Sequence, residues 1–123
     1  MGSPVMHWQI LTTQPQRLQQ FYSTLFGWSV TGDNPLGYQT VDTASGKGIN
    51  GGLWPISPNE GHSMVQLFIR VDDVAEQLKR AVDLGGTVVI PRQVLPGGDE
   101  MAVVVDPDGI PFAIFKGAGA VPQ

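Results

Sequence analysis

Residues 7–28, "HWQILTTQPQRLQQFYSTLFGW", join a strand pattern directly to a helix pattern. Polar and apolar residues largely alternate over residues 7–13, which is typical of a strand with one buried face. Residues 14–26 then carry four apolar or aromatic side chains at helical spacing, which predicts an amphipathic helix. These four are Leu18, Phe21, Tyr22 and Leu25.

The ends of this first helix carry recognisable signals. Thr13 and Gln16 have the spacing of a capping box, and Pro15 stands in the first turn, where its missing N–H costs nothing. Gly27 follows the last apolar residue and predicts the end of the helix. Three short strands are expected next, over residues 28–31, 38–43 and 49–54.

The second half of the chain repeats this order of elements. Residues 64–86, "MVQLFIRVDDVAEQLKRAVDLGG", again read as a strand and a helix that ends at glycine, with Val74, Leu78, Ala81 and Leu84 on one helical face. Strands are expected over residues 87–94, 100–105 and 111–116. The sequence therefore predicts an α+β fold made of two βαβββ modules, about 5–56 and 63–117, in one domain that spans 1–123.

Aligning the glycines that end the two helices gives an offset of 59 residues. This offset places His7 opposite Gln66. Each module alone leaves bare the sheet face that its helix does not cover, so two modules are expected to pair around a trough formed by mostly antiparallel, curved sheets.

Composition limits the kind of protein. Apolar residues make up 41% of the 123 residues and charged residues 15%, which is the balance of a folded globular chain. A net charge of −4 without a basic cluster argues against nucleic acid as a partner. No apolar run approaches the roughly 20 residues of a membrane helix. The absence of cysteine excludes thiolate ligands and fits a cytoplasmic protein.

Several other residues have a structural interpretation. Asp72 and Asp73 are expected to cap the second helix. The Asp106–Gly109 segment, "DPDG", predicts a turn shaped by an aspartate side chain. Gly51 and Gly52 remove two side chains from a strand, which marks a bulge or makes room for a ligand or a partner chain.

Strand alternation assigns faces. Trp8 and Ile10 are expected to pack on the first helix, which turns His7, Gln9 and Leu11 to the other side. In the second module Leu67, Ile69 and Val71 are expected to face the helix, and Phe112 and Ile114 likewise. The polar residues on the remaining face suit either a solvent-exposed surface or the wall of a pocket.

The chain resembles the vicinal oxygen chelate superfamily, which includes glyoxalase I, extradiol dioxygenases and bleomycin-resistance proteins. The resemblance covers residues 7–116 and is carried by "FYSTLFGW", by "VDDV" at the start of the second helix and by the "DPDG" turn. Within that superfamily, the chain is similar to a glyoxalase-like branch of unassigned role. The resemblance implies paired βαβββ modules and a homodimer.

In metal-using members of that superfamily, four ligands hold a divalent ion that chelates two neighbouring substrate oxygens and stabilises an enolate-like intermediate. The resemblance places these ligand positions on His7, Gln66, Ala113 and a residue at or near Gly52. Ala113 stands where metal-using members have a glutamate. Only His7 and Gln66 are able to bind a metal, and two neutral ligands suit hard divalent ions poorly.

The sequence leaves three functional hypotheses. The first is a protein that binds a small organic molecule in the trough, without a cofactor and with a degenerate metal site. The second is a lyase, isomerase or dioxygenase that uses one divalent transition metal ion on His7 and Gln66, or His7 as a metal-free base. The third is a subunit that only supplies an interface. The residues predicted to contact a ligand are Gln9, Gln66, Phe68, Arg70, Trp54, Ala113 and Phe115, with His7 as the candidate catalytic residue.

Overall fold

The computed structural model describes residues 2–32 and 37–117. Contacts divide the described residues into two compact units. One contains residues 7–66, and the other contains residues 67–117 together with the residues before His7. The first is called the α1 unit and the second the α2 unit, after the helix that each contains.

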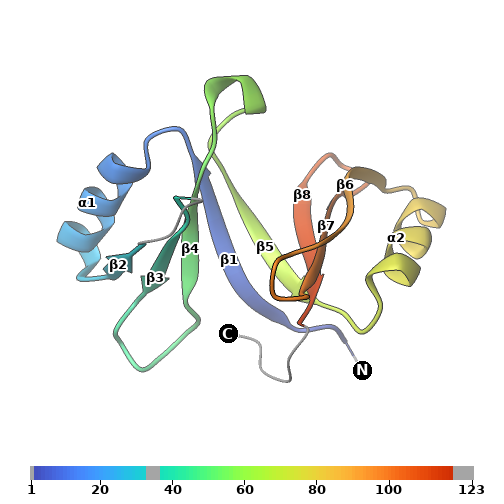
Figure 1. The fold of residues 1–123 in the computed structure, drawn as a ribbon, viewed down its shortest axis with the longest axis horizontal. Helices are drawn as coiled ribbons and strands as arrows, with labels where there is room; N and C mark the ends of the chain where they lie inside the picture. The colour runs from blue at the N-terminus through green and yellow to red at the C-terminus, as the bar shows by residue number, and fades with distance from the viewer. Residues whose placement is uncertain (1, 33–36, 118–123) are drawn as a thin grey trace. The chain divides into compact units, whose positions relative to one another are not determined.

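The α1 unit contains four strands and one α-helix (Figure 1). Its strands lie in the order β2-β3-β4-β1, with β1 parallel to β4 and the other pairs antiparallel. A short 3-10 helix, Pro58–Glu60, follows the last strand and lay outside the sequence prediction. The bounds are β1 Val5–Thr12, α1 Pro15–Phe26, β2 Ser29–Thr31, β3 Gln39–Asp42 and β4 Gly51–Pro55.

Helix α1 ends as predicted but begins differently. Gly27 adopts a left-handed conformation with φ of 74°, and its N–H donates to the Ser23 carbonyl. The expected capping box is wrong, because the N-cap residue is Gln14 and no side chain caps the helix. The Thr12 hydroxyl instead accepts from the Gln14 amide at 2.9 Å, which fixes the turn between β1 and α1.

Aromatic side chains connect α1 to its sheet. The Trp28 ring lies 5.4 Å from that of Trp8 and 5.2 Å from that of Tyr22, measured between ring centroids. The amide of Gln39 in β3 donates to Gln19 in α1 at 2.9 Å. Trp8 therefore faces the helix, as strand alternation predicts, and Trp28 belongs to the same helix-side cluster.

The α2 unit repeats the arrangement (Figure 1). Its strands lie in the order β6-β7-β8-β5, with β5 parallel to β8 and the other pairs antiparallel. The α+β fold with two βαβββ modules and mostly antiparallel pairing is thus confirmed. The bounds are β5 Met64–Arg70, α2 Val74–Asp83, β6 Thr87–Val94, β7 Glu100–Val105 and β8 Pro111–Lys116.

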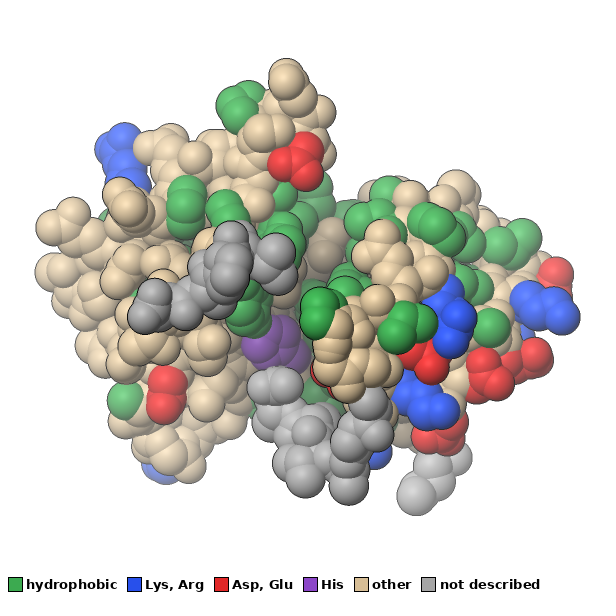
Figure 2. Space-filling model, in the orientation of Figure 1, with side chains coloured by type: hydrophobic (Ala, Val, Ile, Leu, Met, Phe, Trp, Pro, Cys, Tyr) green, Lys and Arg blue, Asp and Glu red, His purple; other side chains and the backbone are tan. Residues whose placement is uncertain are grey.

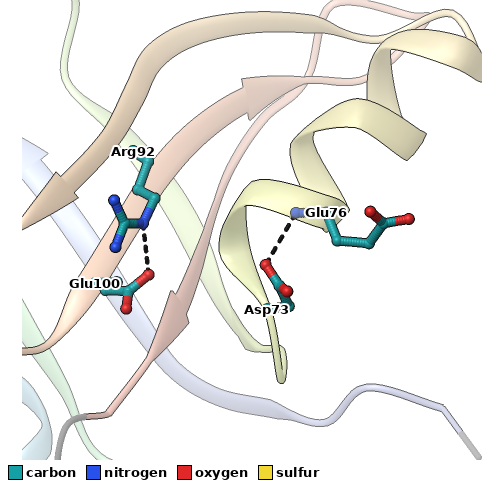
Figure 3. Close-up of polar contacts among 4 residues, drawn as sticks. All are labelled: Asp73, Glu76, Arg92 and Glu100. Atoms are coloured by element: carbon teal, nitrogen blue, oxygen red, sulfur yellow. Dashed lines mark hydrogen bonds and ion pairs between the residues drawn. The ribbon is translucent and has the colours of Figure 1, made fainter.

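Polar side chains fix the ends of two elements in this unit (Figure 3). Asp73 is the N-cap of α2 and its carboxylate accepts from the Glu76 amide at 3.0 Å, whereas Asp72 lies one residue before the cap. Arg92 in β6 forms an ion pair with Glu100 in β7 at 2.7 Å across their hairpin. This contact lowers the pKa of the Glu100 carboxyl and raises that of Arg92.

The turn before β8 also has the predicted form. One carboxylate oxygen of Asp106 accepts from the amides of Asp108 and Ile110, at 2.8 and 2.9 Å. The Asp106 side chain therefore shapes the turn that leads into the strand of Ala113.

The core of the α2 unit lies between α2 and the sheet. Val71, Val74, Ala102 and Ile114 form its buried cluster, with Ile69, Leu78 and Phe112 packed against it. The prediction that Leu67 packs inward is wrong, because Leu67 is 47% exposed. Leu84 lines a cavity together with Ala81, on the predicted helical face, yet it is 73% exposed.

The exposure of Leu84 has a structural context. Toward the end of α2 the small side chain of Ala81 faces a cavity of about 300 Å³ between the helix and the sheet. Ile69, Val104 and Phe112 are among the apolar residues that line this cavity, and Arg80 and Gln77 add polar atoms. None of the residues predicted for the functional site lines it.

Candidate functional site

Two adjacent glycines in β4 serve opposite faces of the α1 unit. A Cβ atom at Gly51 would overlap the ring of Trp8, and a Cβ atom at Gly52 would overlap the hydroxyl of Tyr38. Trp8 lies on the helix side, so Tyr38 lies on the helix-free face. The space that the glycines leave is filled by aromatic side chains of this chain, and the strand pairing runs through both glycines without a bulge.

Tyr38 reaches His7 on that face. The Tyr38 hydroxyl lies 3.0 Å from Nε2 of His7, at hydrogen-bonding distance. His7 is only 8% exposed, and this burial lowers the pKa of its imidazole from the ordinary 6.5. Burial also raises the pKa of the Tyr38 phenol from the ordinary 10.0. At neutral pH both groups are therefore uncharged, because burial disfavours the charged form of each.

Trp54 and Gln9 are further predicted site residues of the α1 unit. The Trp54 ring lies 5.6 Å from the Tyr38 ring, at a tilt of 49°. Gln9 is the register partner of Gly52, so its side chain leaves β1 on the same face. This face therefore combines two aromatic rings with a neutral hydrogen-bonding pair.

Charge is distributed unevenly along the chain, and most acidic and basic residues follow residue 66. In Figure 2 the charged side chains in view lie mostly over the unit that contains α2. Within the described part of residues 7–66 the charged residues are Arg17, Asp42, Lys47 and Glu60. Three of these side chains form hydrogen bonds to residues near them in the chain: Arg17 donates to Gln14, Asp42 accepts from the Ala44 amide, and Glu60 accepts from the Ser57 amide.

In the α2 unit the structure brings four predicted residues onto two neighbouring strands. Phe68 is the register partner of Ala113, and Arg70 is that of Phe115. The rings of Phe68 and Phe115 lie 6.1 Å apart. No described carboxylate forms an ion pair with the Arg70 guanidinium.

Gln66 is buried, with 6% of its surface exposed. Its side-chain amide lies 3.9 Å from the sulfur of Met64, a weak contact within β5. It is the last residue of the α1 unit by contacts, although its strand continues into the α2 unit. The expectation that both helix-free faces line one trough stays a prediction.

Strand register tests the metal positions implied by the superfamily. Gln9 pairs with Gly52 in one unit, and Phe68, its equivalent at an offset of 59, pairs with Ala113 in the other. Gly52 and Ala113 thus hold equivalent places in β4 and β8. Neither has a side-chain atom that could coordinate a metal ion, and Ala113 is fully buried.

These residues do not fit a divalent ion bound as in the metal-using members. The Tyr38 phenol fills the space beside Gly52 and also engages Nε2 of His7. In residues 2–32 and 37–117 no three His, Asp or Glu side chains come together in a way that would hold a metal ion. Two neutral donors without a carboxylate remain, and hard cations bind such sets weakly.

Sequence reasoning gave Tyr38 no polar role, although its hydroxyl lies at hydrogen-bonding distance from His7. Tyr38 is the first residue of the strand expected over residues 38–43, whereas β3 itself begins one residue later. The signal that was available is Gly52, because a glycine in a strand often marks the close approach of another group.

The two βαβββ modules and their strand order define a glyoxalase-like protein. The family profile described as "Glyoxalase-like domain" matches residues 7–115. The chain belongs to this family, which confirms the resemblance seen in the sequence.

Relatives extend the comparison. "Putative glyoxylase CFP32" of Mycobacterium tuberculosis is 28% identical over 123 residues, and so is its counterpart in Mycobacterium bovis. The alignment covers 94% of this chain and 46% of each of those proteins, so the chain spans about half the length of these curated relatives.

Solved structures share the fold at low identity. The hypothetical protein BH1468 from Bacillus halodurans has a TM-score of 0.70 at 13% identity, with all of both chains covered. Streptomyces coelicolor methylmalonyl-CoA epimerase, solved with 2-nitronate-propionyl-CoA, has a TM-score of 0.64 at 14% identity, with 98% of this chain and 99% of the epimerase covered. No helix among the described residues is long and apolar enough to span a membrane.

Proposed function

We propose that this glyoxalase-like chain binds a small, planar, uncharged organic molecule on the helix-free face of the α1 unit, without a bound metal ion. The observation that carries the proposal is the hydrogen bond between Tyr38 and His7 beside Gly52. It supplies a neutral polar group at the place where metal-using relatives have ligands. Trp54, packed against Tyr38, adds an aromatic surface for a planar ligand.

The chemistry of the face supports an uncharged ligand. His7 and Tyr38 are both uncharged at neutral pH, and burying a charged ligand group against neutral groups is costly. A neutral donor and acceptor pair instead matches a carbonyl or hydroxyl oxygen. Aromatic ketones combine such an oxygen with a flat apolar body.

The test uses acetophenone as the probe. Its dissociation constant would be measured by ligand-observed NMR on the tag-free protein, on Trp54→Ala and on the control Phe21→Ala, whose side chain is 55% exposed on α1. We expect saturable binding that Trp54→Ala weakens and Phe21→Ala leaves unchanged. Absence of binding to the wild-type protein would overturn the proposal.

Two alternatives are tested beside it. Titration of nickel, zinc, manganese and iron(II) into the wild type and His7→Gln tests the metal-dependent lyase, isomerase or dioxygenase, because stoichiometric binding lost in the variant would favour that enzyme. Methylmalonyl-CoA joins the panel because a fold neighbour was solved with it. Binding of this anion, if lost in Arg70→Gln, would replace the neutral-ligand proposal.

The cytoplasmic location and the homodimer expected from the sequence stay predictions. Sedimentation equilibrium of the whole chain measures the second directly, with a mass of twice 13.2 kDa as the expected result.

A further inference from the structure

We infer that Tyr38 is the binding residue that takes over the missing ligand position, donating its phenol proton to a carbonyl oxygen of the bound molecule while His7 holds the phenol in place. This inference deepens the proposed function and rests on it. Tyr38 is then the residue that recognises ligand oxygen, and His7 is a positioning residue.

The first step of the argument is space. Gly52 holds the place in β4 that Ala113 holds in β8. In this chain the volume above Gly52 contains the Tyr38 hydroxyl, which a Cβ atom there would overlap. The glycine and the tyrosine are therefore complementary, since the phenol is able to sit at this point only because residue 52 has no side chain.

The second step is the direction of hydrogen bonds. A phenol has one proton to donate, and a neutral imidazole carries its proton on one of two nitrogens. When a ketone is bound, its oxygen is an acceptor only, so the Tyr38 proton turns toward it. His7 then carries its proton on Nε2 and donates it to the Tyr38 oxygen across the observed 3.0 Å.

The third step is charge. A metal ion polarises a carbonyl by its positive charge, whereas this pair is neutral and partly buried and acts by hydrogen bonding alone. Ligands that carry a carbonyl should therefore bind more tightly than ligands of the same shape without it. The preference should be modest, about three- to ten-fold for one neutral hydrogen bond.

Histidine NMR tests the pair without any ligand. The chain has two histidines, and His62 is exposed and serves as the internal reference. We expect Tyr38→Phe to move the ring nitrogen shifts of His7 and to leave those of His62 in place. Gly52→Ala should do the same by displacing the phenol. Its matched control is Gly51→Ala, which meets Trp8 on the opposite face and should leave the His7 shifts near their wild-type values.

A matched pair of probes then tests recognition of oxygen. Acetophenone and ethylbenzene differ by a carbonyl in place of a methylene. The wild type should bind acetophenone more tightly than ethylbenzene, and Tyr38→Phe should remove that preference. Trp54→Ala should weaken the binding of both probes by the same factor. With acetophenone bound, the His7 nitrogen shifts should be those of the Nε2-protonated form.

The outcomes separate the two proposals. Unchanged His7 shifts in Tyr38→Phe would overturn the Tyr38 inference, whether or not a probe binds. An intact pair with no binding of acetophenone would overturn the proposed function instead. Binding with the same carbonyl preference in Tyr38→Phe would leave the proposed function standing and overturn the role of Tyr38.

Discussion

The buried His7–Tyr38 pair should give the folding stability of this protein two pH limits. His7 has a pKa below its ordinary 6.5 because it is buried. As the pH falls below about 6.5, the unfolded chain takes up a proton that the folded chain refuses, so the free energy of unfolding falls. Tyr38 has a pKa above its ordinary 10.0 for the same reason. As the pH rises past about 10, the unfolded chain loses a proton that the folded chain keeps, and stability falls again.

Each of these two losses of stability comes from the titration of a single group, which limits its size. Between the unfolded and folded pKa values the slope approaches but does not exceed ~1.4 kcal/mol per pH unit. His7 is 8% exposed, so solvent screening is small on the acidic side. Carboxylates titrate mainly below pH about 5, which leaves a window between pH 5.5 and 7 in which only histidines contribute.

Urea denaturation followed by tryptophan fluorescence, at constant ionic strength from pH 5.5 to 11, measures the two limits. His7→Gln should reduce the loss of unfolding free energy below pH about 6.5, and Tyr38→Phe should reduce the loss above pH about 10. His62→Gln is the control, because that side chain is exposed and should leave the profile unchanged. An acidic slope equal in His7→Gln and the wild type would refute the reasoning, since it would place the titrating group elsewhere.

Two further predictions concern stability in the α2 unit. Asp73→Ala should lower the free energy of unfolding by about 1 kcal/mol in chemical denaturation, because the α2 cap is lost. Asp72→Ala should change the free energy of unfolding little. Equal effects of the two substitutions would contradict the assignment of the cap. Ala81→Leu should raise the free energy of unfolding by about 1 kcal/mol, because the added carbons partly fill the cavity under α2. Ala75→Leu, on the exposed side of the same helix, should not raise it. A lower melting temperature for Ala81→Leu would show that the cavity has no room for the added carbons.

Most of the architecture was predictable because local signals agreed with one another. Helical spacing followed by Gly27, and strands bounded by turn residues, gave the order of elements and the bounds of β6, β7 and β8. The offset of 59 residues between the modules also relates Gln9 to Phe68, and these two residues are the register partners of Gly52 and Ala113.

What failed depends on packing at a distance. Leu84 has the spacing of a core residue, yet the helix end at which it stands does not close on the sheet, and a pattern of apolar residues does not report such a gap. Thr13 was assigned a cap because its spacing to Gln16 is correct, but the chain enters the helix one residue later.

The site was only partly predictable for a related reason. The contact between Tyr38 and His7 joins residues 31 positions apart, and it depends on a glycine in a third strand. Strand alternation placed His7 on the correct face. It did not connect His7 with Tyr38, the first residue of the strand expected over residues 38–43, because alternation does not report contacts between distant segments.

Strand β1 belongs to both compact units, since the boundary between them falls between Met6 and His7. The Pro4 carbonyl accepts from the Arg70 amide at 3.0 Å, so the start of the chain extends the sheet of the α2 unit. If the gene were divided in the loop between the modules, it would therefore give two polypeptides, and neither of them would contain a whole unit. Such halves should regain structure by complementing one another when mixed, and the first few residues are a poor place to attach a rigid fusion partner.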